Sequence, residues 1–199
     1  MEPARKLATY EDLLALPEET RAEISRGEIV TLPAPRPRHS KAQRALGHFV
    51  GGPFDDDDGA GGPGGWWIFV EVEIRFELHE VVRPDLSGWR RERLLVPDVL
   101  PIDVVPDWIC EVLSPSNASR DRVEKRYLYA RHGVAHYWLA DPLSRTLETL
   151  ALRDGRWVDT GAFGEADVAR IPPFEEVEIP VGRLFLPRSA SPATPADEG

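Results

Sequence analysis

Two short apolar runs separated by a helical pattern constrain the fold of this chain most strongly. Residues 108–113 are apolar except for Glu111, and residues 135–140 form the second run. Between them, residues 119–132 have the periodicity of a helix, with Gly133 as its C-cap. A strand, a helix and a strand in this order predict a crossover between two parallel strands, and therefore an α/β fold.

The remaining patterns add helices and strands around this unit. In the helix at 119–132 we expect the apolar residues to form the buried face and the basic residues to face solvent. The apolar residues are Val123, Tyr127, Leu128 and Ala130. The other predicted elements are a short helix that begins with a capping box at 9–12, a strand at 28–31, a helix at 39–50, strands at 66–78 and 81–89, a hairpin of 146–152 with 156–159, and a small final element at 179–186. The expected class is α/β, with a mixed β-sheet flanked by helices.

The chain length suits one ordinary domain, since it has 199 residues. We predict a single domain over residues 1–187, with a flexible loop at 51–65 that is rich in Gly, Pro and Asp, and a disordered tail at 188–199. No run of about 18 apolar residues occurs, so we expect no membrane-spanning helix. The one cysteine, Cys110, lies in an apolar run and cannot form an internal disulfide, which fits a core position and a cytoplasmic protein.

The formal net charge of −10 opposes nucleic-acid binding, because affinity for the phosphate backbone comes largely from Lys and Arg. The charges are unevenly distributed, however. Acidic residues gather at 55–58 and 165–178, whereas basic residues gather at 36–44, 90–93 and 120–131. A local basic face is therefore compatible with the sequence.

Two carboxylates stand out as candidates for metal chemistry. Glu111 is the one charged residue in an otherwise apolar strand, where an ionised group is unfavourable unless it is paired or bound to a cation. Asp85 follows Pro84 where the chain is expected to leave the sheet. Two carboxylates and a backbone carbonyl at one sheet edge are the hard oxygen ligands that Mg²⁺ prefers. A nearby lysine would position the attacking water and offset negative charge.

These residues also carry a resemblance to a known family. The motifs are Val82-Arg-Pro-Asp85, Trp108-Ile-Cys-Glu-Val-Leu-Ser-Pro-Ser116, Asp121 with Lys125 and Tyr129, and Gly133-Val-Ala-His-Tyr-Trp-Leu-Ala-Asp-Pro142. With Tyr10–Leu13, Gly27–Val30 and Pro35–His39 upstream, the chain resembles the Uma2 family over residues 8–187. That family is assigned to the PD-(D/E)XK nuclease superfamily, so the resemblance implies a restriction-endonuclease-like fold and a phosphodiesterase activity.

The resemblance assigns roles to three side chains. Asp85 matches the aspartate of the Pro-Asp motif, and Glu111 matches the acidic residue of the (D/E)-x-K motif. The lysine of that motif is replaced by Leu113, and Lys125 on the following helix takes its place in the family pattern. This departure bears on catalysis and not on the fold. The implied metal ligands are Asp85, Glu111 and the carbonyl of Val112.

Each candidate also has a purely structural interpretation. Lys125 and Asp121 are spaced to form an i,i+4 ion pair on an exposed helix face, and Asp85 has the setting of an ordinary turn residue. Glu73 alternates with apolar neighbours and is a weaker accessory candidate. His39 precedes a helix, where it would either contact phosphate or cap the helix.

The leading hypothesis is a Mg²⁺-dependent nuclease, with Mn²⁺ as an alternative metal and DNA favoured over RNA as the substrate. The second hypothesis is a nuclease fold kept as a binding or regulatory module with little or no activity. A third keeps the same site and changes the substrate to another phosphodiester or a small nucleotide. A homodimer also stays open, with the Trp-rich residues 66–69 either at its interface or in the core.

Overall fold

The computed structural model describes residues 6–55, 62–96 and 98–188. Its larger sheet has six strands in the order β10-β9-β8-β7-β6-β3. The bounds are β3 Trp66–Val70, β6 Leu86–Arg90, β7 Trp108–Val112, β8 His136–Asp141, β9 Thr146–Arg153 and β10 Arg156–Gly164. The strands β7 and β8 are parallel, as the sequence predicts, and the other neighbours in this sheet are antiparallel. The mixed sheet and the α/β class are therefore confirmed.

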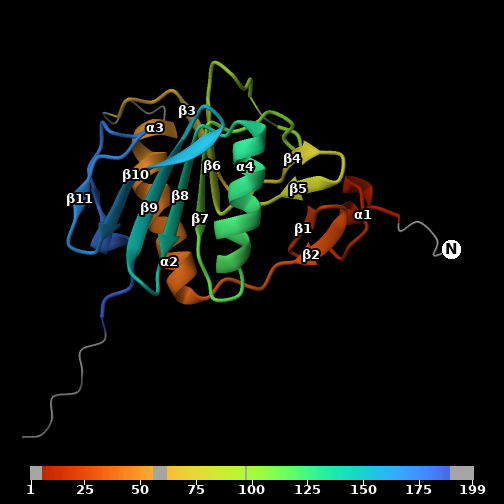
Figure 1. Cartoon of the computed structure of the whole chain (residues 1–199), viewed down its shortest axis with the longest axis horizontal. Helices are drawn as coiled ribbons and strands as arrows, with labels where there is room; N and C mark the ends of the chain where they lie inside the picture. Colours follow the sequence, from red (N-terminus) through yellow and green to blue (C-terminus); the bar gives the residue numbers. More distant parts are fainter. Residues whose placement is uncertain (1–5, 56–61, 97, 189–199) are drawn as a thin grey trace, which may run out of the picture.

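Helices cover both faces of this sheet (Figure 1). On one face lies α2 (Pro37–Leu46), which continues through a π-helical turn (Gly47–Gly51) into α3 (Gly52–Asp55). On the other face lies the crossover helix between β7 and β8. Strands covered on both faces are apolar at nearly every position. In β7, Trp108, Cys110 and Val112 pack toward the α2 face, whereas Ile109 packs toward the crossover helix.

The crossover helix buries a different face from the predicted one. It consists of a π-helical turn, Arg120–Lys125, followed by α4, Arg126–His132, and it ends at Gly133 with a left-handed φ of 81°. Val123 and Tyr127 are 65% and 69% exposed, so their predicted burial was wrong. The buried residues are Asp121, Lys125, Leu128 and Tyr129. Charged side chains are buried here because their partners come from other parts of the chain.

A second, four-stranded sheet stands beside the first, at the right in Figure 1. Its order is β2-β1-β5-β4, with β1 Ala22–Ser25, β2 Glu28–Thr31, β4 Ile74–Glu77 and β5 Glu80–Val82. The short helix α1 (Tyr10–Leu14) packs on it, and the backbone N–H of Thr9 donates to the Asp12 carboxylate as the capping box requires. The strand β2 was predicted and β1 was not.

The hairpin of residues 66–90 is divided between the two sheets. The predicted strands 66–78 and 81–89 were each wrong as single strands, because β3 and β6 pair in the large sheet while β4 and β5 pair in the small one. Two local features break the strands. Glu71 has a backbone φ of 55°, in the left-handed region that residues other than glycine rarely adopt. Pro84 lacks the backbone N–H that pairing with a neighbouring strand requires.

The predicted loop at 51–65 was partly wrong. Residues 51–55 are helical, and residues 62–65 have no regular structure; residues 56–61 lie outside the described residues, as do 189–199 of the predicted tail. The chain closes with β11 (Val168–Ala169), β12 (Ile179–Pro180) and a 3-10 turn at Val181–Leu184, which fulfils the predicted small final element. Among the described residues, every helix is too short or too polar to cross a bilayer.

Two core predictions have clear outcomes. Cys110 is fully buried, and burial raises the pKa of its thiol well above the usual range, as expected of an inert core cysteine. Trp66 is also buried, against Phe174 on the α2 face of the sheet, which places this residue in the core.

Candidate active site where the two sheets meet

The site begins where strand β6 stops pairing with β7. Backbone pairing between them runs only from Gly88 with Trp108 to Leu86 with Cys110, so β7 continues past the end of β6. Asp85 fills the place of the missing strand, because its Oδ2 accepts the backbone N–H of Val112 at 2.7 Å. A buried N–H group needs such an acceptor. The geometry therefore attaches Asp85 to β7 at the residue next to Glu111.

Glu111 points to the opposite face of the sheet from its neighbours Cys110 and Val112, since side chains alternate along a strand. That face is covered by the crossover helix. Lys125 Nζ lies 2.9 Å from Glu111 Oε1, and the Tyr129 hydroxyl donates to the same oxygen at 2.7 Å. The two helix residues are four positions apart and share one helix face. The predicted reach of Lys125 to Glu111 is thus present.

The lysine also contacts a third carboxylate that the sequence interpretation missed. Glu23, in β1, is completely buried, and its Oε1 lies 2.9 Å from Lys125 Nζ. The Arg83 backbone N–H donates to the same Oε1 at 2.8 Å, and Arg120 NH1 lies 2.6 Å from the other oxygen, Oε2. The local sequence does not single out Glu23, because its apolar neighbours Ala22 and Ile24 are themselves flanked by the polar residues Arg21 and Ser25.

Asp121 completes the buried charges. Its Oδ1 is 3.7 Å from Lys125 Nζ, and neither of its carboxylate oxygens has a hydrogen-bond partner. The i,i+4 spacing with Lys125 is therefore present. The structural interpretation placed this ion pair on an exposed helix face. That part was wrong, because both residues are buried.

Burial and mutual repulsion shift the pKa values of this cluster. Burial, with only partial relief from Lys125, raises the pKa of Glu111 above its usual range and that of Asp121 to about 6. Burial would lower the pKa of Lys125, but the carboxylates of Glu111, Glu23 and Asp121 outweigh it, and the net shift is upward. The lysine is therefore held as an ammonium ion.

His39 joins the site from the first turn of α2. Its Nε2 lies 3.0 Å from Asp85 Oδ1, and the residue is 8% exposed. Burial disfavours the imidazolium, yet the hydrogen bond and charge of Asp85 outweigh this and raise the pKa of His39. The interpretation of His39 as a cap is not supported, since the residue before α2 is Arg36 and no side chain caps the helix. Its Nδ1 is buried and has no hydrogen-bond partner.

The other accessory candidate, Glu73, has different partners. Its Oε2 accepts the Tyr10 hydroxyl at 2.5 Å, and its Oε1 pairs with Arg83. Glu73 does not line the cavity that contains Asp85 and Glu111. The structure therefore brings together Asp85, Glu111, Lys125 and His39, with the backbone of Val112, and leaves Glu73 outside this group.

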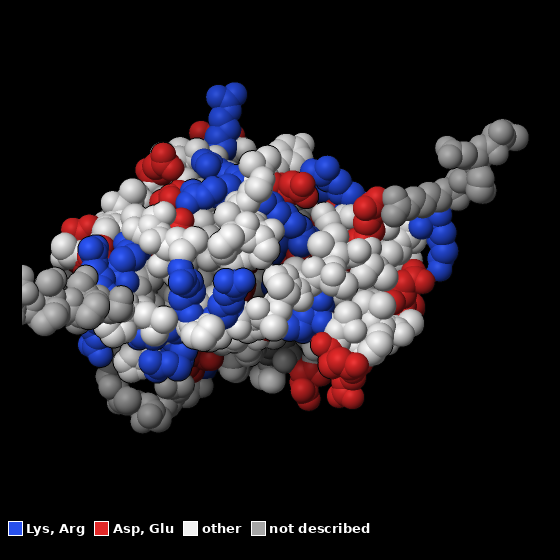
Figure 2. Space-filling view, turned by 90° about the horizontal axis from the view of Figure 1, so that it is seen from below, with Lys and Arg blue, Asp and Glu red and all other residues white. Residues whose placement is uncertain are grey.

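A cavity of about 260 Å³, called here the carboxylate cavity, opens over these residues. Asp85, Glu111 and Lys125 are 7%, 2% and 5% exposed at its inner surface. One wall is the segment 32–39, which leads into α2, and the other is the segment 113–117, which follows β7. Four arginines also line it: Arg21, Arg36, Arg38 and Arg83. Figure 2 views the molecule from below, and Lys and Arg side chains spread across the middle of this face.

The donor set of the carboxylate cavity fits a single hard cation. No group of three or more His, Cys, Asp or Glu able to hold a metal occurs within the described part of the chain. Mg²⁺ does not require one, because it usually keeps several waters and binds one or two protein carboxylates. Asp85 and Glu111 supply these. The carbonyl of Val112 faces the same side of β7 as its N–H, which Asp85 already binds.

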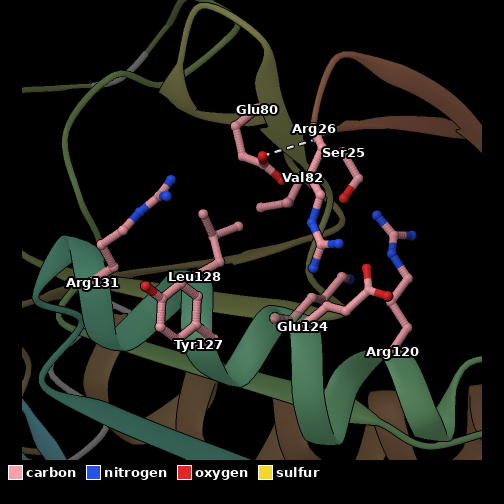
Figure 3. Close-up of a pocket in the computed structure, with 10 residues that line it drawn as sticks. Ser25, Arg26, Glu80, Val82, Arg120, Glu124, Tyr127, Leu128 and Arg131 are labelled. Carbon is pink, nitrogen blue, oxygen red and sulfur yellow. Dashed lines mark hydrogen bonds between the residues drawn. The ribbon is translucent and has the colours of Figure 1, made fainter.

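A second cavity lies on the other side of Lys125, between the crossover helix and the small sheet, and is called the helix cavity. Its volume is about 220 Å³. Figure 3 shows arginines from separate elements around it, namely Arg26 from the β1–β2 turn and Arg120 and Arg131 from the helix. The Arg26 backbone N–H donates to Glu80 at 3.0 Å, while Glu124 is exposed.

Comparisons with known proteins agree with this architecture. A crystal structure described as "a putative nuclease belonging to DUF820" from Anabaena variabilis ATCC 29413 superposes with a TM-score of 0.67 at 23% sequence identity. The match covers 89% of this chain and 97% of the other, and it supports the restriction-endonuclease-like fold. No curated protein matches the sequence. Residues 7–182 match Uma2, a family described as "putative restriction endonuclease". This chain therefore belongs to the Uma2 family.

Proposed function

We propose that this protein is a Mg²⁺-dependent nuclease that hydrolyses phosphodiester bonds in nucleic acid, with DNA favoured over RNA and Mn²⁺ as an alternative metal. The observation that carries the proposal is the meeting of Asp85, Glu111 and Lys125 at the inner surface of one cavity. These residues come from a loop, a strand and a helix that are separate in the sequence. Membership of a family described as nuclease-like supports the reaction class.

The proposed metal ligands are Asp85, Glu111 and the carbonyl of Val112. A bound Mg²⁺ would polarise a phosphoryl oxygen and lower the pKa of a coordinated water. The protein contributes the orientation of the ligands. The Val112 N–H holds Asp85, while Lys125 and Tyr129 hold Glu111, so both carboxylates are fixed before substrate arrives.

Lys125 acts in this proposal as a hydrogen-bond donor and a fixed positive charge. Because its pKa is raised, it does not accept a proton from water at neutral pH. Its ammonium group lies at the cavity surface beside Glu111, where it can orient an attacking water and offset the charge that develops on phosphate. The replacement of the strand lysine by Leu113 is compensated from the helix.

The net charge of −10 is compatible with this function because the arginines are placed locally. Arg21, Arg36, Arg38 and Arg83 surround the two carboxylates in the carboxylate cavity. They would attract the phosphates of a substrate that approaches this cavity.

A binding module without catalysis is the second candidate, and one observation favours it. Each oxygen of Asp85 and Glu111 already has a partner within the protein, from His39, Val112, Lys125, Tyr129 or, at 3.4 Å, the Asp85 N–H. The cluster is thus satisfied without a cation. Under this candidate, Mg²⁺ would leave the melting temperature unchanged.

The test combines cleavage with metal binding. Purified protein is incubated with end-labelled single-stranded and duplex DNA and RNA, with Mg²⁺, Mn²⁺ or EDTA, beside an Asp85→Asn variant. We expect cleavage that requires the metal and is lost in the variant. We also expect Mg²⁺ to raise the melting temperature of the wild-type protein and not that of Asp85→Asn, because a ligand that binds only the folded state stabilises it. Equal cleavage by both proteins would reject the proposal.

A further inference from the structure

The helix α2 begins with an unusual charge pattern. Its first turn contains no acidic residue, and its N-cap is Arg36, whose side chain makes no capping hydrogen bond. Arg38 follows in the first turn. Helix N-termini carry a partial positive charge and favour acidic residues, so cations at this end oppose the helix dipole. The arrangement becomes favourable when an anion binds there.

The two arginines are available for such an anion. Arg36 and Arg38 are exposed, both line the carboxylate cavity, and neither forms an ion pair with any described residue. In contrast, Arg21 and Arg83 on the same cavity are paired with Glu71 and Glu73.

A second observation in the same turn points to a ligand. His39 lines the cavity, is more than nine-tenths buried, and binds Asp85 through Nε2. Its Nδ1 is buried without a hydrogen-bond partner. A buried polar atom of this kind is rare in a native fold and is commonly satisfied by a water or ligand. The turn thus combines two free guanidinium groups with one unpaired ring nitrogen.

The size of the cavity limits what can reach the carboxylates. Glu111 and Asp85 lie at its inner surface, between the walls formed by residues 32–36 and 113–117. Pockets for drug-sized ligands measure about 300–1,000 Å³, so a cavity of about 260 Å³ accepts roughly one nucleotide. A stacked duplex is a stiff body, and its groove alone is about 12 Å wide. In a flexible single strand, one phosphate and its sugar can enter between the walls of the carboxylate cavity.

We propose that the carboxylate cavity takes nucleic acid as a single strand, and that Arg36 and Arg38, at the N-terminus of α2, bind the phosphate next to the one over Asp85 and Glu111. This inference rests on the proposed nuclease function and specifies its substrate class. It assigns a positioning role to the arginines, since they hold the strand and do not touch the reacting phosphate.

The experiment measures binding separately from cleavage. Fluorescence anisotropy is recorded in EDTA with the full chain and three labelled probes: a 12-nucleotide single-stranded DNA, the RNA of the same sequence, and a blunt DNA duplex of the same length. We expect at least one single strand to bind ten-fold or more tighter than the duplex. The double variant Arg36→Ala/Arg38→Ala is expected to weaken that binding at least ten-fold.

The matched control is Arg153→Ala/Arg156→Ala, which removes the same charge from the exposed β9–β10 hairpin. It should change binding by less than twofold. The salt dependence gives a second readout, because each phosphate contact on a single strand contributes about 0.7 to the slope of log K against log salt. The cavity variant should lose about 0.7 or more of this slope. Its melting temperature should be unchanged or higher, since cations are removed from a helix N-terminus.

Two outcomes would overturn the inference: a duplex that binds as tightly as the single strands, or a cavity variant that binds like the hairpin control. These are distinct from failure of the proposed function. If single-strand binding needs Arg36 and Arg38 but no metal-dependent cleavage occurs, the nuclease function is rejected and the proposed binding site stands. If duplex is cleaved in a metal-dependent way and the Arg36→Ala/Arg38→Ala variant cleaves it equally well, the nuclease function stands and the proposed binding site is rejected.

Discussion

The carboxylate cavity and the helix cavity lie on either side of Lys125, and both are lined by arginines and glutamates. They differ in where the acids sit. In the carboxylate cavity, Asp85 and Glu111 are buried and fixed by backbone and side-chain donors. The helix cavity has one acid of this kind, Glu80, which is buried and accepts the Arg26 N–H, but its other acid, Glu124, is an exposed helix residue. Charges of similar kind therefore have different consequences, because only buried charges are held in one geometry and are weakly screened by solvent.

The largest expected difference is in catalysis. Glu111→Gln should lower metal-dependent cleavage about 100-fold or more, because metal binding contributes several kcal/mol to the transition state and about 1.4 kcal/mol corresponds to a factor of ten. Glu124→Gln, the same change in the helix cavity, should stay within twofold of wild type. Initial rates with labelled substrate in Mg²⁺ measure both. Similar losses in the two variants would remove the distinction between the cavities.

The next difference is in stability. Lys125→Met leaves the buried Glu111 and Glu23 without their shared cation, and breaking a buried ion pair from one side costs about 3–5 kcal/mol. Arg131→Met breaks an exposed pair with Glu77, for which about 0–1 kcal/mol is expected. Urea unfolding at pH 7 compares the two free energies. A Lys125→Met protein as stable as the Arg131→Met protein would show that the buried cluster is not held by its lysine.

Asp121 should make stability depend on pH. Burial raises its pKa to about 6 in the folded protein from a model-peptide value of 3.8, so the folded state binds more protons than the unfolded state between these values. Stability from this group is complete below about pH 4 and falls as the pH rises to about 6, by up to about 3 kcal/mol at roughly 1.4 kcal/mol per pH unit. Asp121→Asn should reduce this fall, measured by urea unfolding at pH 4 and pH 6.5. Glu124→Gln serves as the control, and equal pH profiles for the two variants would contradict the expectation.

The smallest effect concerns the turn that borders the helix cavity. Arg26 and Gly27 connect β1 to β2 with φ values of 51° and 75°, the pattern of a two-residue hairpin turn that favours Asn-Gly. Arg26→Asn should raise stability by about 0.5 kcal/mol by relieving the left-handed strain at a bulky residue. Single-strand binding should not change. A loss of nucleic-acid affinity in this variant would show that the helix cavity also contacts the substrate.

Local chemistry in the sequence indicated two members of the site, and the family resemblance indicated a third, Lys125. Glu111 is a lone acid within an apolar strand, and Asp85 follows a proline at a strand end. Each of these two local signals is contained in a few neighbouring residues. The strand–helix–strand order likewise predicted the parallel pair β7 and β8, because a crossover helix requires it.

The partners of these residues could not be found in the same way. Glu23 reaches Lys125 from β1, about a hundred positions earlier in the chain, and no local pattern indicates which strand lies beside the helix. The division of the hairpin 66–90 between two sheets was missed for a similar reason. An alternating strand pattern shows that side chains face two environments, and does not show that the pairing partner changes along the strand.

The sequence by itself determined the class of fold, the order of strands and helices around β7, and the charged residues that are candidates for the site. Only the tertiary structure decided which face of the crossover helix is buried. Asp121 and Lys125 are buried, whereas Val123 and Tyr127 are exposed. The physical reason is that burial of a charge depends on the partners that distant segments bring to it. Periodicity records the local preference of each side chain and holds no information about those partners.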